Sequence, residues 1–91
     1  MHSGVVSRRG SHEDRWRQAL GMGVRKTRLE QQLTQEQLAE RSGIHVTDIS
    51  HLEGGNRNPG YLTMLRISSG LGVPLAELVS TIEKIEGELA P

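Results

Sequence analysis

The sequence predicts an all-α fold of five short helices in one small domain. Apolar residues recur at helical spacing in successive segments, and none of the 91 residues falls in the alternating pattern of a strand. Glycine, proline and polar residues separate these segments. A chain of this size buries only roughly 60–65% of its unfolded surface, so a single compact core is expected.

The first helix is expected over residues 13–32, at the start of a domain that spans residues 13–91. Residues 1–12 contain glycine, serine and arginine without a period, so they are expected to form a flexible N-terminal arm. Gly21 and Gly23 each lower helical stability by about 1 kcal/mol. A break or a bend in the first helix is therefore predicted at these two residues.

The second helix, over residues 35–42, has the clearest start and end signals. Thr34 and Gln37 have the spacing of a capping box, in which the hydroxyl accepts a free backbone N–H and the amide reaches back to the cap. Gly43 follows the last helical residue, where a left-handed conformation commonly ends a helix.

Three further helices are expected over residues 45–53, 61–71 and 75–86. A loop rich in glycine and asparagine, residues 54–60, ends the third. Pro74 is expected at the first position of the fifth, where its missing N–H costs nothing.

The spacing of small and apolar residues over the second and third helices predicts a helix-turn-helix. A small side chain at Ala39 allows close helix approach, and Gly43 allows the positive φ that a short turn needs. Ile44, Ile49 and Leu52 are expected to anchor the third helix to the core. Five side chains then remain on its outer face, namely His45, Val46, Thr47, Ser50 and His51.

From about residue 20 to residue 79 the chain resembles the phage-repressor/Cro-like helix-turn-helix domain, the XRE family. The segments that carry the resemblance are VRKTR at 24–28, TQEQLAERSGI at 34–44, DISHLEGG at 48–55, RNP at 57–59 and LRISSGLGVPLAEL at 65–78. The segment IHVTDIS followed by RNP is most similar to the branch that includes restriction–modification controller proteins. The resemblance implies a five-helix repressor-like fold.

The resemblance also implies roles for individual residues. The helix at 45–53 matches the recognition helix, which lies in the major groove of DNA. The positions that match base-facing residues are His45, Val46, Thr47 and His51, with Ser50 close by. Those that match phosphate-facing residues are Gln35, Asn56 and Arg57. Arg28 and Glu53 match an ion pair that ties the first helix to the third.

Several residues differ from those usual in the family. Gly54 stands where arginine or lysine is common, Gln32 where a glycine usually ends the first helix, and Gly60 where a serine caps the fourth. The fourth helix is therefore expected to be soft. Residues 34–58 carry two basic against four acidic residues, which predicts a shallow salt dependence of DNA binding.

An apolar stripe in the last helix has two possible uses, either to cover the domain's own core or to form a dimer seam. Its length and apolar content exceed what one small core needs, which favours a homodimer. The predicted seam residues are Leu75, Leu78, Val79, Ile82 and Ile85.

Together these observations predict a non-enzymatic, sequence-specific regulator of transcription that binds double-stranded DNA as a homodimer on a near-palindromic operator. Its composition, without cysteine, signal peptide or apolar membrane span, suits the cytoplasm. No cofactor, metal or small-molecule ligand is expected, because no catalytic arrangement, ligand cluster or phosphate loop occurs in the sequence. The alternative is a protein-interaction module or antitoxin-type partner with the same fold and weak or no DNA binding.

Overall fold

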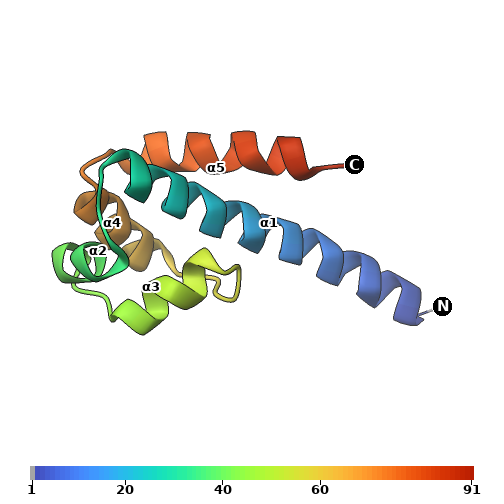
Figure 1. Ribbon diagram of the computed structural model, residues 1–91. Coiled ribbons are helices and arrows are strands. Elements are labelled where there is room, and N and C mark those ends of the chain that lie inside the picture. Colours follow the sequence, from blue (N-terminus) through green and yellow to red (C-terminus); the bar gives the residue numbers. More distant parts are fainter. Residues whose placement is uncertain (1) are drawn as a thin grey trace.

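The computed structural model describes the backbone of residues 2–91 and the side chains of residues 12–91. Over this range it contains no strand, and the predicted all-α, five-helix fold is confirmed (Figure 1). The helices are α1 (His2–Glu30), α2 (Gln35–Ser42), α3 (Val46–Glu53), α4 (Tyr61–Leu71) and α5 (Leu75–Leu89).

The start of α1 differs from the prediction. The helix begins at His2 rather than at residue 13, so its backbone runs through most of residues 1–12, the segment expected to be a flexible arm. No proline interrupts it, and extending an existing helix adds one hydrogen bond for each residue that becomes ordered. Met1 and the side chains of residues 2–11, on which the expectation of a flexible arm falls, lie outside the described residues.

The two glycines of α1 do not break it, so that prediction is wrong. A Cβ on Gly21 would lie 2.4 Å from the carbonyl oxygen of Leu52 and 2.6 Å from that of Glu53. A Cβ on Gly23 would lie 2.6 Å from Cγ1 of Ile82. Both glycines therefore allow other helices to approach the backbone of α1, and this packing outweighs their low helical propensity.

The end signals of α2 are confirmed. The Thr34 hydroxyl accepts a hydrogen bond from the Gln37 backbone N–H at 3.0 Å, and Gln37 Oε1 accepts one from the Thr34 N–H at 2.8 Å. Gly43 ends the helix in the left-handed region, with φ of 70°. The chain can therefore turn sharply before α3.

The later helices differ only slightly from their expected bounds. His45 is the cap residue before α3, and its side chain makes no capping hydrogen bond. Pro74 likewise precedes α5 instead of forming its first position. The end of α5 extends to Leu89 rather than to residue 86, because Leu89 packs against the core.

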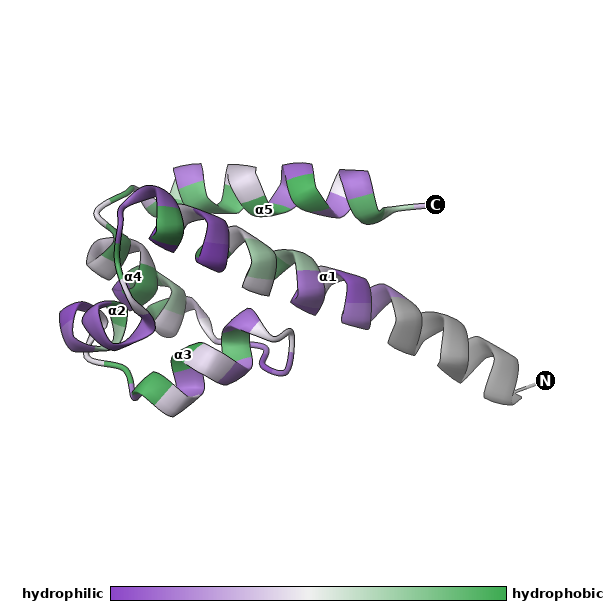
Figure 2. Ribbon diagram, in the orientation of Figure 1, coloured by the Kyte–Doolittle hydropathy of each residue, from purple (hydrophilic) through white to green (hydrophobic). Residues whose placement is uncertain are grey.

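The core lies between a pair of long helices and the three shorter ones. α5 lies alongside α1, α3 and α4 also contact α1, and α2 packs against α3 and α4 (Figure 1). The buried apolar residues are all aliphatic: Ala19, Val24, Leu38, Ile49, Leu52, Met64, Ile67, Leu71, Leu78, Ile82 and Ile85. Hydrophilic and hydrophobic residues alternate along the ribbon of α5, as expected for a helix with one face on a core (Figure 2).

The predicted dimer seam on α5 is corrected by the structure. Leu78, Ile82 and Ile85 are only 1%, 6% and 8% exposed within the single chain, and Leu75 is half-buried. Of the five predicted seam residues only Val79 is exposed. The stripe therefore covers the domain's own core, since α1 supplies the surface against which it packs.

No single helix within residues 2–91 is long and apolar enough to span a membrane. Helices α4 and α5 reach the required composition only as a pair, and they are bent by 100° relative to one another. Their apolar side chains contribute to the core described above.

Candidate nucleic-acid interface

The turn between α2 and α3 has the geometry expected of a helix-turn-helix. The carbonyl of Ala39 accepts hydrogen bonds from the N–H of Gly43 at 2.9 Å and of Ile44 at 3.1 Å. Ala39 and Ile44 are half-buried, and Ile49 and Leu52 lie in the core. These contacts hold α3 against α2 along one side and leave its opposite side in solvent.

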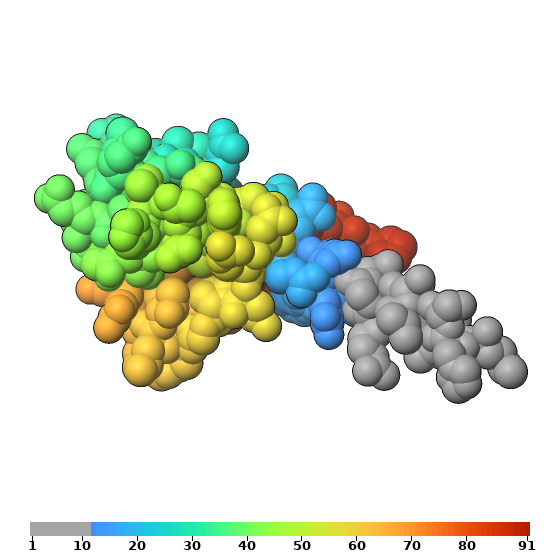
Figure 3. Space-filling model, turned by 90° about the horizontal axis from the view of Figure 1, so that it is seen from below, coloured from blue at the N-terminus to red at the C-terminus, as the bar shows by residue number. Residues whose placement is uncertain are grey.

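The outer face of α3 carries four exposed side chains from the predicted base-facing set: His45, Thr47, Ser50 and His51. The fifth, Val46, is half-buried because it lies in a shallow hollow beside Ala39 and Glu40 of α2. Figure 3 views this side of the molecule, where α3 in yellow-green, the following loop in yellow and α4 in orange are all exposed.

Arg28 and Glu53 form a buried, two-pronged ion pair between α1 and α3. Arg28 Nε lies 2.7 Å from Glu53 Oε2 and Nη2 lies 3.0 Å from Oε1. The side chains are 9% and 4% exposed. The hydrogen bond to Glu53 raises the pKa of Arg28 above its ordinary value, although burial acts in the opposite direction. The guanidinium therefore stays charged, and α3 is held at a fixed angle to α1.

Gln35, a predicted phosphate-facing residue, is tied to the same carboxylate. Its Nε2 donates to Glu53 Oε1 at 3.0 Å, and the side chain is half-buried at the start of α2. One N–H and the carbonyl oxygen of the amide remain for another partner. Glu53 thus joins α1, which carries Arg28, and α2, which carries Gln35, to α3, which carries the predicted base-facing residues.

The other two predicted phosphate-facing residues, Asn56 and Arg57, are exposed in the loop after α3. Arg57 Nη2 lies 2.8 Å from His51 Nδ1 and 3.9 Å from Asp48 Oδ1, and Nη1 donates to the Asn56 carbonyl at 3.2 Å. Arg57 therefore adds a permanent cation at the edge of the outer face of α3, whose own residues include none.

Asp48 has no role in the sequence-based prediction, yet it lies between the outer face of α3 and the loop. Its carboxylate is exposed and faces Arg57. The sequence could have indicated that Asp48 lies beside His51, because the two are one helical turn apart and therefore share a side of α3. Nothing in the sequence indicated that the loop returns Arg57 to that same side.

Comparison with known proteins agrees with this geometry. The model of a family described as helix-turn-helix matches residues 24–78. An uncharacterized HTH-type transcriptional regulator, y4dJ, of Sinorhizobium fredii is 37% identical over 68 residues, which cover 75% of this chain and 88% of the relative. Control protein C.MunI of a Mycoplasma species is 40% identical over 65 residues, which cover 70% and 88%.

Among solved structures, this chain is similar to the restriction–modification controller protein C.Esp1396I, determined as a tetramer in complex with its natural 35 base-pair operator. The two share 30% identity with a TM-score of 0.73, over 78% of this chain and 93% of that one. The protein therefore belongs to the XRE-type helix-turn-helix family of DNA-binding transcription regulators, and within it resembles the restriction–modification controllers.

Proposed function

We propose that the protein is a sequence-specific regulator of transcription that binds a near-palindromic operator as a homodimer. The observation that carries this proposal is the outer face of α3, which exposes hydrogen-bonding side chains while Ile49, Leu52 and Glu53 fix its inner side. A helix held in this way can enter the major groove of DNA with a fixed register. The operator complex of C.Esp1396I supports the same use of the fold.

The side chains on α3 suit base recognition by hydroxyls and an apolar contact. Thr47 and Ser50 can donate to or accept from several base edges, and the exposed part of Val46 can pack on a thymine methyl group. His45 and His51 can donate to guanine acceptors or to phosphate. Gln35, Asn56 and Arg57 are proposed to contact the DNA backbone, which sets the position of α3 in the groove.

A homodimer is proposed because one domain presents a single recognition helix. Two such helices about 34 Å apart would meet successive major grooves on one side of the duplex. The buried stripe of α5 is not available for this contact. Tyr61 and Leu62, at the start of α4, are 67% and 70% exposed and offer apolar surface for a second copy.

Selection of bound sequences from a random duplex pool tests this proposal. We expect enrichment of two inverted half-sites whose centres lie about 10 base pairs, or a multiple of one turn, apart. The double variant Thr47→Ala, Ser50→Ala should lose sequence preference while keeping salt-dependent binding, since the backbone contacts remain.

The alternative is a protein-interaction module of the same fold. If no sequence is enriched, and the protein binds no duplex more tightly than about 10⁻⁴ M at physiological salt, the DNA-binding proposal is wrong. The exposed Tyr61 and Leu62 would then be the surface to test for a protein partner.

A further inference from the structure

A pocket of about 450 Å³ lies on one flank of α3, between the α3–α4 loop and α4. Three parts of the chain meet there. The first turns of α3 contribute His45 and Asp48, the loop contributes Arg57 and Asn58, and α4 contributes Thr63 and Arg66. All three parts belong to one continuous segment, residues 43–66, which folds around the pocket.

The polar groups around the pocket are those of an anion site. Two arginines, Arg57 and Arg66, and a single carboxylate, that of Asp48, line the pocket, which leaves an excess of positive charge. The hydroxyl of Thr63, the amide of Asn58 and the imidazole of His45 add further possible donors. Hydrogen-bond donors around a net cationic centre favour a phosphate group.

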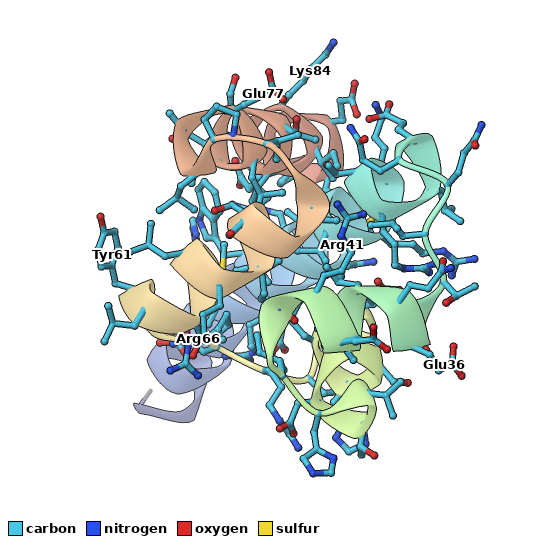
Figure 4. The ribbon with its side chains drawn as sticks, turned by 90° about the vertical axis from the view of Figure 1, so that its left-hand side faces the viewer. Glu36, Arg41, Tyr61, Arg66, Glu77 and Lys84 are labelled. Atoms are coloured by element: carbon cyan, nitrogen blue, oxygen red, sulfur yellow. The ribbon has the colours of Figure 1, made fainter. Side chains whose placement is uncertain are left out.

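Arg66 is the arginine available to a ligand. It is exposed, and among the side chains of residues 12–91 it has no hydrogen-bond or ion-pair partner. Arg57, in contrast, already contacts His51 and Asp48. In Figure 4, Arg66 extends from α4 away from α5, where Glu77 and Lys84 lie.

We infer that this pocket binds a backbone phosphate of the operator, with Arg66 as the group that neutralises its charge. The inference rests on the proposed function. The pocket residues His45, Asp48 and Leu52 follow one flank of α3, directly beside the outer face that carries Thr47 and His51. When a helix lies in the major groove, the sugar–phosphate strands run along its flanks, so a phosphate is the anion expected there.

The salt dependence of operator binding by Arg66→Gln tests the inference. Loss of one phosphate contact should lower the slope of log K against log salt by about 0.9, which corresponds to a roughly eightfold weaker association at 0.1 M salt. Sequence preference in the selected pool should not change, because a phosphate carries no base identity. Lys84→Gln removes the same charge from an exposed site on α5 and should leave both slope and affinity unchanged.

The possible outcomes separate this inference from the proposed function. If the wild type binds the operator and Arg66→Gln matches Lys84→Gln in slope and affinity, the phosphate assignment is wrong and the regulator proposal stands. If the wild type binds no duplex, both are wrong. A further arm adds millimolar inorganic phosphate, against chloride, without DNA. If Arg66 NMR signals shift there while the operator slope of Arg66→Gln stays that of the wild type, the pocket holds a free anion and the backbone assignment fails.

Discussion

At the scale of single residues, one buried carboxylate connects three helices of the candidate nucleic-acid interface. Glu53 accepts hydrogen bonds from Arg28 of α1 and Gln35 of α2, and it sits at the end of α3. The Glu53 side chain is only 4% exposed, and its charge is stabilised because both of its oxygens accept hydrogen bonds, one of them from two donors. The angle between α3 and its neighbours therefore depends on this residue.

Replacement of Glu53 by alanine should be strongly destabilising. It leaves the guanidinium of Arg28 buried without a counterion, which lowers the free energy of unfolding by about 3–5 kcal/mol. Urea denaturation measures the change. The double variant Arg28→Met, Glu53→Met buries no charge and should recover much of the loss. A decrease below about 1 kcal/mol in Glu53→Ala would contradict the role assigned to the pair.

Gly21 gives a second prediction at this scale. Alanine normally stabilises a helix by about 1 kcal/mol over glycine, but here its Cβ would collide with the carbonyl oxygens of Leu52 and Glu53. We expect Gly21→Ala to lower the melting temperature and to weaken DNA binding, because α3 must shift. Gly87→Ala in α5 meets no atom within 4 Å and should leave stability unchanged or slightly higher. Equal effects of the two substitutions would refute the close approach.

At the scale of helices, α1 and α2 end in the same way with different residues. In each case a backbone N–H just past the helix donates to a carbonyl oxygen of its last turn: Leu33 N–H to Arg28 O at 3.0 Å, and Ile44 N–H to Ala39 O at 3.1 Å. The residue before it is left-handed, with φ of 60° at Gln32 and 70° at Gly43. Only the second of these turns uses the residue that adopts this conformation without strain.

This comparison predicts opposite effects of two reciprocal substitutions. Gln32→Gly should raise the free energy of unfolding by about 0.5–1 kcal/mol, since it removes a left-handed strain of about 1–2 kcal/mol at a smaller cost in unfolded-chain entropy. Gly43→Ala should lower it by about 1 kcal/mol or more, because the open space around Gly43 leaves backbone strain as the only effect. Chemical denaturation checks both. A loss of stability in Gln32→Gly would show that its side chain matters more than its backbone.

At the scale of the whole molecule, the long α1 changes how the domain can assemble. It packs along α5, and Arg15 Nε contacts Glu86 Oε2 at 2.7 Å near the far end of that pair. This packing buries most of the apolar stripe of α5. Among the exposed large apolar side chains of the described residues, Tyr61 and Leu62 are neighbours in sequence and are the most exposed, at 67% and 70%.

The homodimer is predicted to depend on this exposed surface. Leu62→Glu should give monomers in sedimentation at micromolar concentration and weaken operator binding, because two half-sites are no longer bound together. Its secondary structure should not change, since Leu62 contributes nothing to the core. Leu29→Glu, at a 53% exposed site on α1, is the control and should remain dimeric. A wild type that is itself monomeric at micromolar concentration contradicts the prediction.

Local signals in the sequence predicted most of the helix-turn-helix. The Thr34 capping box and Gly43 depend on atoms within a few residues of each other, so they could be identified from the sequence alone. The outward direction of Thr47 and Ser50 followed from the inward assignment of Ile49 and Leu52 at helical period. Local reasoning failed at α1, where the glycines suggested a break or a bend.

The sequence by itself determined the fold class, the turn and the outer face of α3, because periodicity and capping act over one or two turns. Only the tertiary structure decided the contacts between helices and loops, because these depend on how the elements pack. In the folded chain the apolar stripe of α5 packs against α1, and Gln35 is hydrogen-bonded to Glu53. Arg57 and Arg66 lie on the flank of α3. In each case the partners belong to different helices or loops, and such side chains meet only when these elements have packed together.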